Sequence, residues 1–572
     1  MNTPPKARAP QSTGKRVNAA ALIIVAAGFL LRLYLASGTF LNPDEALHFF
    51  IANRDSWSSA YHASLTMAHP PLLIFLLYWW RNLGTSEMLL RLPSVLLGAA
   101  FCWIFFCWLN KFFGAAVALN GLLFTALLAP MSLLSAEVRQ YELLLFFGMS
   151  SAYLLEVAFE KNSPAFMLLS AASLYLAMLS HYSALLWVAT LGIYGLMRLW
   201  NRKSSPGLLA AWLASQLGAL ALAGFLYLTH VSKIKKTTMA EQAFDSWLYK
   251  SYFHAGHDNP VVFLLARTFS VFQFMLGQSV IGDIAALLFV AGVVLLWRGK
   301  IMLPASGVGS RQLAVLLILP FIVNCAAAFC DAYPYGGTRH SVFLAVFGLA
   351  GISVCLVRIA GGHRARSLGF ALATILLCWG FRSVRHPYID RADQRRTQME
   401  RALTFVHDEI PASEIIFVDY ESSLELGHYL CAQSPVVYDG SVPGFLVFNC
   451  GGHRIVSTIN DLWAFDRQMF IAQLQQLIAN AGLKSGDRVW VAQAGWIVTL
   501  ADDLQQDALK KIDPAFRNLN VQSFGKNIQF FPVTVGTPFL SARGSFNPSA
   551  GTASASGFAR PFALVTTPKL PL

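Results

Sequence analysis

Long apolar runs repeat along the first two thirds of the chain, and short polar stretches separate them. Runs of about 17–25 apolar residues are long enough to cross a bilayer as helices. The pattern therefore predicts about eleven membrane-spanning helices within residues 19–382. We expect them over residues 19–37, 92–109, 115–131, 141–159, 165–180, 182–199, 208–228, a stretch ending at 297, 313–329, a stretch ending at 358, and 368–381.

Two further apolar stretches do not fit the length of a span. Residues 72–80 are too few to cross, and Trp79 and Trp80 favour a helix that lies in the membrane interface. Residues 261–276 contain Arg267, which leaves an interfacial helix and a half-inserted helix as alternatives.

Basic residues fix the expected orientation, because cytoplasmic loops carry an excess of Lys and Arg. The clusters at 198–203, 298–300 and 358–366 alternate with loops that lack this excess. If residues 72–80 crossed the membrane, two of these clusters would fall outside. We expect residues 1–18 in the cytoplasm, before an uncleaved anchor, and outer loops at 38–91, 132–140, 229–259 and 330–340.

The pattern changes after residue 382. Residues 383–537 alternate strand-like and helix-like stretches, with strands expected at 414–420 and 487–496 and an amphipathic helix at 466–482. Such alternation predicts a small soluble α/β domain, placed on the outer side by the span count. Residues 538–572 are rich in Ser, Gly, Ala and Pro, which predicts a disordered tail.

Composition supports this fold class, an α-helical polytopic membrane protein with a small C-terminal soluble α/β domain. The chain has 572 residues, of which 55% are hydrophobic and 13% charged. The net charge of +13 is explained by cytoplasmic loops that face anionic lipid. No soluble basic domain is expected, so nucleic acid is not an expected partner.

The eight cysteines show no spacing typical of a metal site. Cys431 and Cys450 lie in the domain expected outside the cytoplasm, where oxidation is allowed. The loop between them contains Pro and Gly residues that let the chain turn back. We predict a disulfide between these two residues; the alternative is a pair of buried, unpaired thiols.

Unusual polar groups gather in the expected outer loops. Ionisable groups at the ends of spans are costly unless they pair or serve a water-filled site. Arg91 and the three lysines lie in loops expected outside the cytoplasm, where basic residues are usually depleted. A bound anion on that side would explain them. The set comprises Asp44, Glu45, His48, His69, Arg91, Glu137, Arg139, His181, Lys233, Lys235, Lys236 and Arg339.

Four motifs occur in order along residues 22–186. They are the adjacent acids Asp44 and Glu45 after the first span, HPPL at 69–72, RLPS at 91–94, and SAEVRQYELLLFF at 135–147. This order resembles the polyprenyl-phosphate-sugar glycosyltransferases with the GT-C fold. That superfamily includes the dolichyl-phosphate-mannose protein mannosyltransferases and the lipid A aminoarabinose transferase.

The resemblance implies an inverting sugar transfer from a lipid-phosphate donor to an acceptor hydroxyl on the extracytoplasmic face of the plasma membrane. The acceptor is a glycan, a lipid or a protein, and no cofactor is required. The catalytic acid of the family aligns with Asp44, with Glu45 beside it, and the arginines implicated in phosphate binding align with Arg91 and Arg139. Arg339 is our choice for the later phosphate-binding residue, although His340 follows it where the family often has tyrosine.

The residue types suit this chemistry. A sugar on a lipid phosphate already has a good leaving group, so the enzyme needs a base for the acceptor hydroxyl and cations for the departing phosphate. Asp44 fits the first role. Arginine fits the second, because its planar fork matches two phosphate oxygens.

Other interpretations remain open for the acidic residues and histidines of the first loop. Asp44 and Glu45 could begin a helix after Pro43, and Glu45 could contact the acceptor, orient Asp44 or cap the helix. His48 lies one helical turn after the acids, so a divalent metal held by Asp44, Glu45, His48 and His69 is an alternative to a hydrogen-bond network.

The remaining polar residues also have two interpretations. In one interpretation they line the site or contact the acceptor. In the other they have local structural roles: Glu137 and Arg139 form an ion pair, His181 makes a hydrogen bond between spans, and the lysines contact lipid headgroups. Tyr141, two residues after Arg139 in the motif, is assigned a supporting role. The lysines concerned are Lys233, Lys235 and Lys236.

Two other classes of function compete with a transferase. A transporter or flippase of lipid-linked sugars predicts charges at mid-span and an internal repeat, whereas the polar groups here are expected at span ends. A non-catalytic envelope assembly protein would use the soluble domain to recruit partners.

Overall fold

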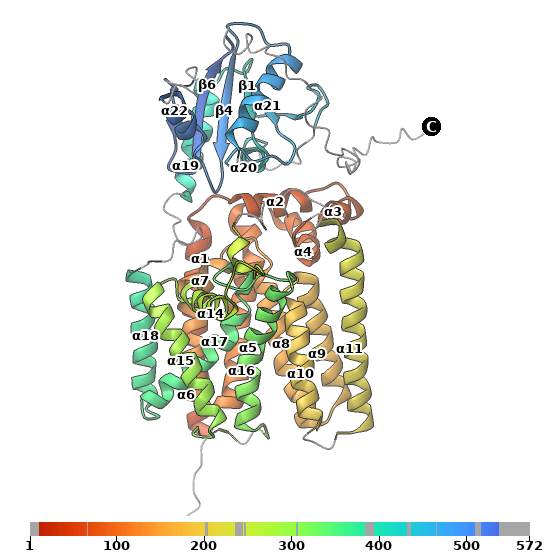
Figure 1. Ribbon diagram of the computed structural model, residues 1–572, viewed down its shortest axis with the longest axis vertical. Helices are drawn as coiled ribbons and strands as arrows, with labels where there is room; N and C mark the ends of the chain where they lie inside the picture. The colour runs from red at the N-terminus through yellow and green to blue at the C-terminus, as the bar shows by residue number, and fades with distance from the viewer. Residues whose placement is uncertain are drawn as a thin grey trace, which may run out of the picture.

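The computed structural model has a helical bundle with an α/β domain on one end (Figure 1). The structure describes residues 11–65, 67–200, 204–234, 244, 247–301, 303–304, 307–381, 383, 394–431, 436, 438–464, 466–509, 516 and 518–536. The predicted tail at 538–572 lies outside the described residues.

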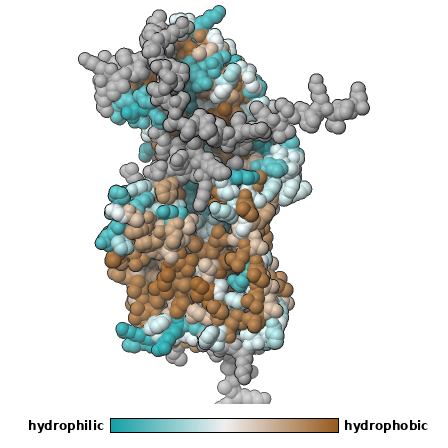
Figure 2. Space-filling view, turned by 45° about the vertical axis from the view of Figure 1, so that its right-hand side comes forward, coloured by the Kyte–Doolittle hydropathy of each residue, from teal (hydrophilic) through white to brown (hydrophobic). Residues whose placement is uncertain are grey.

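A helix lies at each predicted span. Six helices of the described chain are long and apolar enough to cross a membrane, and the others are shorter. The predicted count of eleven spans therefore stays a prediction. On the face shown in Figure 2, apolar surface covers the middle of the bundle between hydrophilic ends. The helices are α1 (Gln11–Ser37), α5 (Glu87–Phe113), α6 (Ala115–Leu127), α8 (Tyr141–Lys161), α9 (Pro164–Ser180), α10 (Ala184–Trp200), α11 (Pro206–Leu226), α15 (Ser279–Trp297), α16 (Ser310–Phe329), α17 (Leu344–Ile359) and α18 (Arg364–Gly380).

The third predicted span is not continuous, because a second helix, α7 (Ala129–Leu134), begins after α6. Pro130 has no N–H to donate to the carbonyl of Ala126, so the α-helical ladder breaks there. Arg32 of α1 compensates, since its guanidinium donates to the carbonyls of Thr125 and Ala126, each at 2.8 Å. The break thus comes with a buried arginine that satisfies the freed carbonyl groups.

Short helices cover the end of the bundle that faces the α/β domain (Figure 1). They are α2 (Pro43–Ala52), α3 (Trp57–Ser64) and α4 (Leu72–Trp80), which share one apolar cluster. The nine residues of α4 are too few to cross a bilayer, in line with an interfacial helix. Helix α14 (Pro260–Leu276) appears nearly end-on in Figure 1 and so lies across the neighbouring helices. This orientation favours the interfacial alternative for that stretch.

The C-terminal domain contains a mixed six-stranded sheet of order β2-β3-β1-β4-β6-β5. The fully buried β1 (Ile415–Val418) pairs in parallel with both of its neighbours, and the outer pairings are antiparallel. The other strands are β2 (Leu446–Cys450), β3 (His453–Ser457), β4 (Arg488–Ala494), β5 (Gln522–Ser523) and β6 (Ile528–Thr534).

Helices cover both faces of this sheet, and a separate apolar cluster fills each side. One cluster includes α21 (Arg467–Asn480) and α22 (Leu500–Leu509), and the other includes α19 (Arg396–Glu409) and α20 (Tyr420–Leu430). The two predicted strands and the predicted amphipathic helix correspond to β1, β4 and α21.

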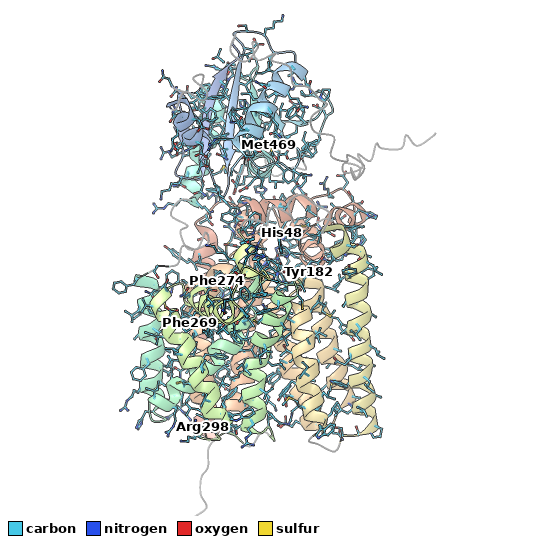
Figure 3. The ribbon with its side chains drawn as sticks, in the orientation of Figure 1. His48, Tyr182, Phe269, Phe274, Arg298 and Met469 are labelled. Carbon is cyan, nitrogen blue, oxygen red and sulfur yellow. A yellow bond between two sulfur atoms is a disulfide. The ribbon has the colours of Figure 1, made fainter. Side chains whose placement is uncertain are left out.

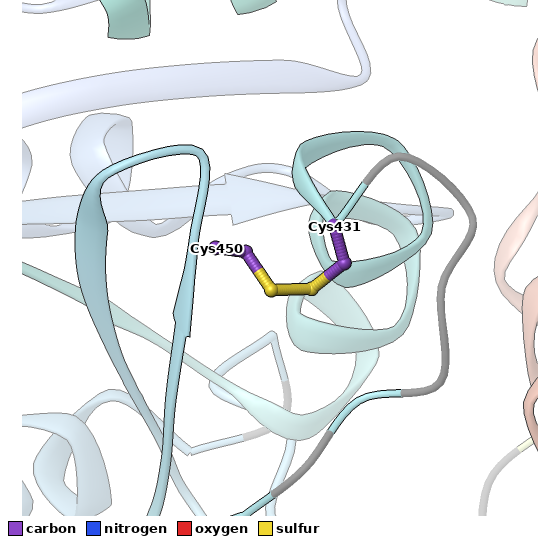
Figure 4. The surroundings of a disulfide bond; sticks show 2 residues. All are labelled: Cys431 and Cys450. Carbon is purple, nitrogen blue, oxygen red and sulfur yellow. A yellow bond between two sulfur atoms is a disulfide. The ribbon is translucent and has the colours of Figure 1, made fainter.

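A disulfide joins Cys431 at the end of α20 to Cys450 at the end of β2 (Figure 4). Their α-carbons are 4.7 Å apart, within the range that a disulfide requires. The structure therefore places a bond at the pair expected from the sequence.

The C-terminal domain is docked on the segment between α1 and α5. The chain after α1 runs beside the start of α19, where the amide of Phe40 donates to the carbonyl of Gln394 at 3.2 Å. Helix α20 packs on α2, and the rings of Phe49 and His428 meet edge to face with centroids 5.0 Å apart. The loop that carries the predicted catalytic acids therefore lies between the bundle and the α/β domain.

Candidate active site

Helix α2 begins with a capping box that fixes the direction of its two acids. The side chain of Asn42 accepts from the amide of Glu45 at 3.0 Å, and the carboxylate of Glu45 accepts from the amide of Asn42 at 3.0 Å. Pro43 occupies the first turn, which suits its fixed backbone angle. The capping alternative thus applies to Glu45, while Asp44 keeps its side chain for other partners.

The carboxylate of Glu45 is fully engaged. It forms a bidentate ion pair with Arg91, with both N···O distances at 2.7 Å, and also accepts from the amide of Val138 at 2.8 Å. Each side chain of the pair is only 1% exposed. Burial opposes the ionisation of Glu45, but the charge of Arg91 outweighs it and lowers the pKa.

The remaining N–H groups of Arg91 donate to three backbone carbonyls, those of Ala36, Thr39 and Phe40. The guanidinium therefore has no donor left for a ligand. These contacts favour a structural role for Arg91 and Glu45 over the predicted roles at the phosphate and the substrate. The two residues form a buried clamp between α5 and the segment before α2, and neither motif could reveal that they bind each other.

Three other predicted residues meet at one point. Oδ2 of Asp44 lies 3.0 Å from Nη1 of Arg139 and 2.7 Å from Nη1 of Arg339. Arg139 precedes α8, and Arg339 begins the 3₁₀ turn η4 (Arg339–Ser341) before α17. Asp44 and Arg339 are 24% and 22% exposed, whereas Arg139 is 1% exposed. The cluster is therefore open on one side only.

Charge controls the protonation of Asp44. Burial alone would oppose ionisation, but the two guanidinium groups of Arg139 and Arg339 hold the pKa of this carboxyl well below its usual range. Without a ligand, Asp44 is thus an ionised but weak base.

Four histidines continue from this cluster. The ring of His48 faces that of His69 at a centroid distance of 6.2 Å, and His69 faces His181 at 5.1 Å. His181 also lies 6.2 Å from His340 and 5.2 Å from Tyr141. Figure 3 shows His48 beneath α2 at the outer end of the bundle. The late histidine that departs from the family pattern therefore belongs to the same group.

These imidazoles are neutral near pH 7. Burial, aided by the charge of Arg139, lowers the pKa of His48 to about 4. Burial and the adjacent Arg339 lower the pKa of His340 to about 3. Burial also brings the pKa values of His69 and His181 well below the usual range. A neutral imidazole offers one donor and one acceptor.

The alternative of a metal site does not fit these contacts. Within the described part of the chain, no group of three or more His, Cys, Asp or Glu residues is placed to hold a metal ion. In the predicted set, Glu45 is saturated by Arg91 and backbone amides, and Asp44 is held by two arginines. We derive no step through a metal.

The other predicted residues divide into near and distant groups. Glu137 is buried and acts through its charge on Arg139 and Arg91. Tyr141 presents its ring to the guanidinium of Arg139, 5.5 Å from the ring centroid. Lys233 is exposed in α12 (Ser232–Ile234) and makes no ion pair among the described residues. Lys235 and Lys236 lie outside the described residues.

Sequence reasoning missed one residue of the C-terminal domain. The hydroxyl of Tyr429 accepts from the amide of Leu41 at 2.8 Å, beside the cap of α2. No motif surrounds Tyr429, so only the docking of α20 could have identified it.

Comparisons with known proteins bear on the fold and on one segment of the chain. Residues 68–230 match the family model described as dolichyl-phosphate-mannose-protein mannosyltransferase. The apo structure of ArnT from Cupriavidus metallidurans superposes with a TM-score of 0.50 at 11% identity, covering 92% of this chain and 99% of that one.

Two other structures are less similar. AglB, an oligosaccharyltransferase from Archaeoglobus fulgidus, gives a TM-score of 0.44 at 12% identity, over 82% of this chain and 69% of that one. The protein O-mannosyltransferase complex Pmt1-Pmt2 of S. cerevisiae gives 0.31 at 20% identity, over 38% and 34%. No curated protein sequence matches the chain.

The chain has the GT-C fold, and its match to a glycosyltransferase family model over residues 68–230 supports the class of a membrane glycosyltransferase. Within that class, the segment 68–230 carries the sequence pattern of the dolichyl-phosphate-mannose-protein mannosyltransferase family. The class predicted from the sequence is thereby confirmed, and the alternatives of a flippase or an assembly protein are not favoured.

Proposed function

We propose that this protein transfers a sugar from a polyprenyl-phosphate donor to an acceptor hydroxyl on the extracytoplasmic face, with inversion at the anomeric carbon. The observation that carries the proposal is the contact of one carboxylate, Asp44, with two arginines at the outer end of the bundle. A base and two cations are the groups that such a transfer needs.

Arg139 and Arg339 bind the donor phosphate in this proposal. Two nitrogens of Arg139, Nε and Nη2, are buried without a hydrogen-bond partner, so its fork has capacity for phosphate oxygens. Arg339 approaches from another segment and is partly exposed, which lets the phosphate enter between them.

Donor binding then activates Asp44. The phosphate shares the two guanidinium groups, so the charge that depresses the pKa of Asp44 decreases and its carboxylate becomes a stronger base. Asp44 takes the proton of the acceptor hydroxyl as its oxygen attacks the anomeric carbon from the face opposite the phosphate. The bond from that carbon to the phosphate oxygen breaks, and the polyprenyl phosphate leaves with the electron pair, stabilised by the arginines.

The charge distribution supports a cytoplasmic N-terminus and an extracytoplasmic site in the plasma membrane. Arg298 lies at the end of the bundle opposite His48 (Figure 3). A basic inner end and an outer site follow the positive-inside rule. The apolar band around the bundle gives the polyprenyl chain and membrane lipids a surface to contact (Figure 2). The acceptor is a hydroxyl of a glycan, a lipid or a protein.

Replacing the proposed base tests the function. Asp44→Asn keeps the size of the side chain but cannot take a proton at neutral pH, and we expect turnover of a polyprenyl-phosphate sugar in detergent to fall at least about 100-fold. Asp55→Asn, in the exposed part of the same loop, is the matched control and should keep full turnover. Near-normal turnover by Asp44→Asn, with unchanged thermal unfolding, would reject the proposal.

A further inference from the structure

Several buried ring nitrogens beside Asp44 have no hydrogen-bond partner. They are Nε2 of His48, Nδ1 of His69 and Nε2 of His181. The side chains of His48 and His181 are 2% and 1% exposed. Folded proteins rarely leave buried polar atoms unpaired, so such a group needs polar atoms from a ligand or from water. The hydroxyl of Tyr182, labelled below His48 in Figure 3, is also unpaired.

In His181 and His48, the hydrogen bond of one ring nitrogen decides whether the other, unpaired nitrogen donates or accepts. Nδ1 of His181 accepts from the amide of Ser183 at 3.2 Å, so its Nε2 carries the proton and donates. Nδ1 of His48 faces the carbonyl of Asp44, so it donates there and its Nε2 accepts. One imidazole therefore offers a donor and the other an acceptor.

We propose that His48, His69 and His181 form the subsite for the sugar of the donor, and that this subsite takes an uncharged, hydroxyl-bearing sugar rather than an amino sugar. The inference rests on the proposed function, because it places the sugar next to the phosphate held by the arginines. One hydroxyl group of the sugar can accept from His181, and another can donate to His48.

Hydrogen-bond capacity disfavours an ammonium group at His181. An ammonium only donates, so it leaves the N–H of His181 without an acceptor. The neutral histidines offer no compensating negative charge.

Binding measurements on the purified full chain test the subsite separately from the transfer. The dissociation constant of bare polyprenyl phosphate is compared with those of the same carrier bearing glucose, mannose, galactose or glucosamine. We expect at least one neutral sugar to tighten binding about tenfold. Glucosamine, which differs from glucose by one charged group, should bind more weakly than glucose.

Substitutions then assign the gain to the histidines. His48→Phe and His181→Phe keep an aromatic ring but remove its nitrogens. Each should therefore reduce the increase in affinity that the sugar provides and leave the affinity for bare carrier unchanged. His181→Gln, whose amide N–H reaches the position of Nε2, should restore part of it. His453→Phe, a buried histidine of β3 with an unpaired nitrogen, is the matched control.

The outcomes are distinct. The subsite is overturned if no neutral sugar tightens binding, if glucosamine binds more tightly than glucose, or if variants that unfold like the wild type keep the full gain. Failure of bare polyprenyl phosphate to bind at all would instead reject the proposed function, and the subsite with it.

Discussion

The hydroxyl of Tyr429 in the C-terminal domain donates a hydrogen bond to the carboxylate of Glu87 in the bundle, at 3.0 Å. Glu87 begins α5, one turn before Arg91, and the same hydroxyl accepts from the amide of Leu41. One side chain thus ties the α/β domain to both segments that hold the start of α2. The position of Asp44 therefore depends on the docking of this domain.

We predict that Tyr429→Phe lowers the rate of sugar transfer without unfolding the protein. The amide of Leu41 and the carboxylate of Glu87 lose a buried partner, at a cost of about 1–3 kcal/mol. A looser first loop should lower kcat by about tenfold and speed amide hydrogen exchange over residues 38–52. Tyr34→Phe, on the exposed face of α1, is the control and should change neither quantity. Wild-type kcat and exchange in Tyr429→Phe would contradict the role.

The sequence predicted much of the membrane fold because the physical signal is local. Span length, interfacial tryptophans and basic loops each depend on neighbouring residues, and α4 shows that a nine-residue apolar run can be distinguished from a span. The split between α6 and α7 was missed, because the effect of Pro130 depends on Arg32, almost a hundred residues away.

The site was predicted in its residue types but not in its pairing. Motifs pointed to Asp44 and Arg139, and Arg339 was chosen without a firm motif; the structure brings the three together. The same motifs gave Arg91 an identical role, although its donors are all used by Glu45 and carbonyl groups. Which arginine meets which acid is decided by tertiary packing, and spacing along the chain does not report it.

The two buried arginines should respond differently to substitution. Arg91→Gln leaves Glu45 as an uncompensated buried charge, which should destabilise the protein by roughly 3–5 kcal/mol. Arg139→Gln faces the donor, so we expect turnover to fall about 100-fold with a much smaller loss of stability. Thermal unfolding in detergent and turnover per folded molecule separate the effects. Equal destabilisation by both substitutions would show that Arg139 is also a structural residue.

The stability of the C-terminal domain should fall as the pH rises. Burial, aided by Asp419, raises the pKa of Glu421 in α20 from 4.5 to about 8, although the amide of Trp496 donates to it at 2.7 Å. Burial also brings the pKa of Glu425 well above its usual value. Because the folded state holds these protons more tightly, their stabilising effect is complete below the unfolded pKa near 4.5 and is lost as the pH approaches 8.

Glu421→Gln tests this dependence, since glutamine resembles the protonated acid and does not titrate. Unfolding temperatures of the full chain should decline between about pH 5 and 8 in the wild type, and the decline should be smaller in the variant. Glu409→Gln, at the exposed end of α19, is the control. A wild-type profile that is flat, or that rises with pH, would contradict the assignment.

The first outer loop and the C-terminal domain should lie on the same side of the membrane. Their direct docking requires this, and the charge bias predicts the extracytoplasmic side. Ser59 and Ser523 are exposed in the two regions and suit single cysteine substitutions in a background without the native cysteines. Both should react with an impermeant reagent on intact cells. Labelling of only one would contradict the docking, and labelling of neither would place both regions on the cytoplasmic side.

The last prediction concerns the bond between Cys431 and Cys450. It joins residues separated by 19 positions. Closing a loop of that size lowers the entropy of the unfolded chain, which stabilises the folded domain by about 3 kcal/mol. In a domain of this size, that should shift the unfolding temperature by roughly 6–12 °C. Reductant, or Cys431→Ser, should therefore lower the unfolding temperature of the C-terminal domain, because the covalent link between α20 and the sheet is lost.

Cys330→Ser, which removes an exposed free thiol, is the control and should have no effect. Alkylation after denaturation without reductant should leave both cysteines of the bond unmodified. Two free thiols in protein from an oxidising compartment would show that the bond does not form. Loss of the bond should also reduce sugar transfer, since Tyr429 precedes Cys431 by two residues and its contact with Leu41 depends on the position of α20.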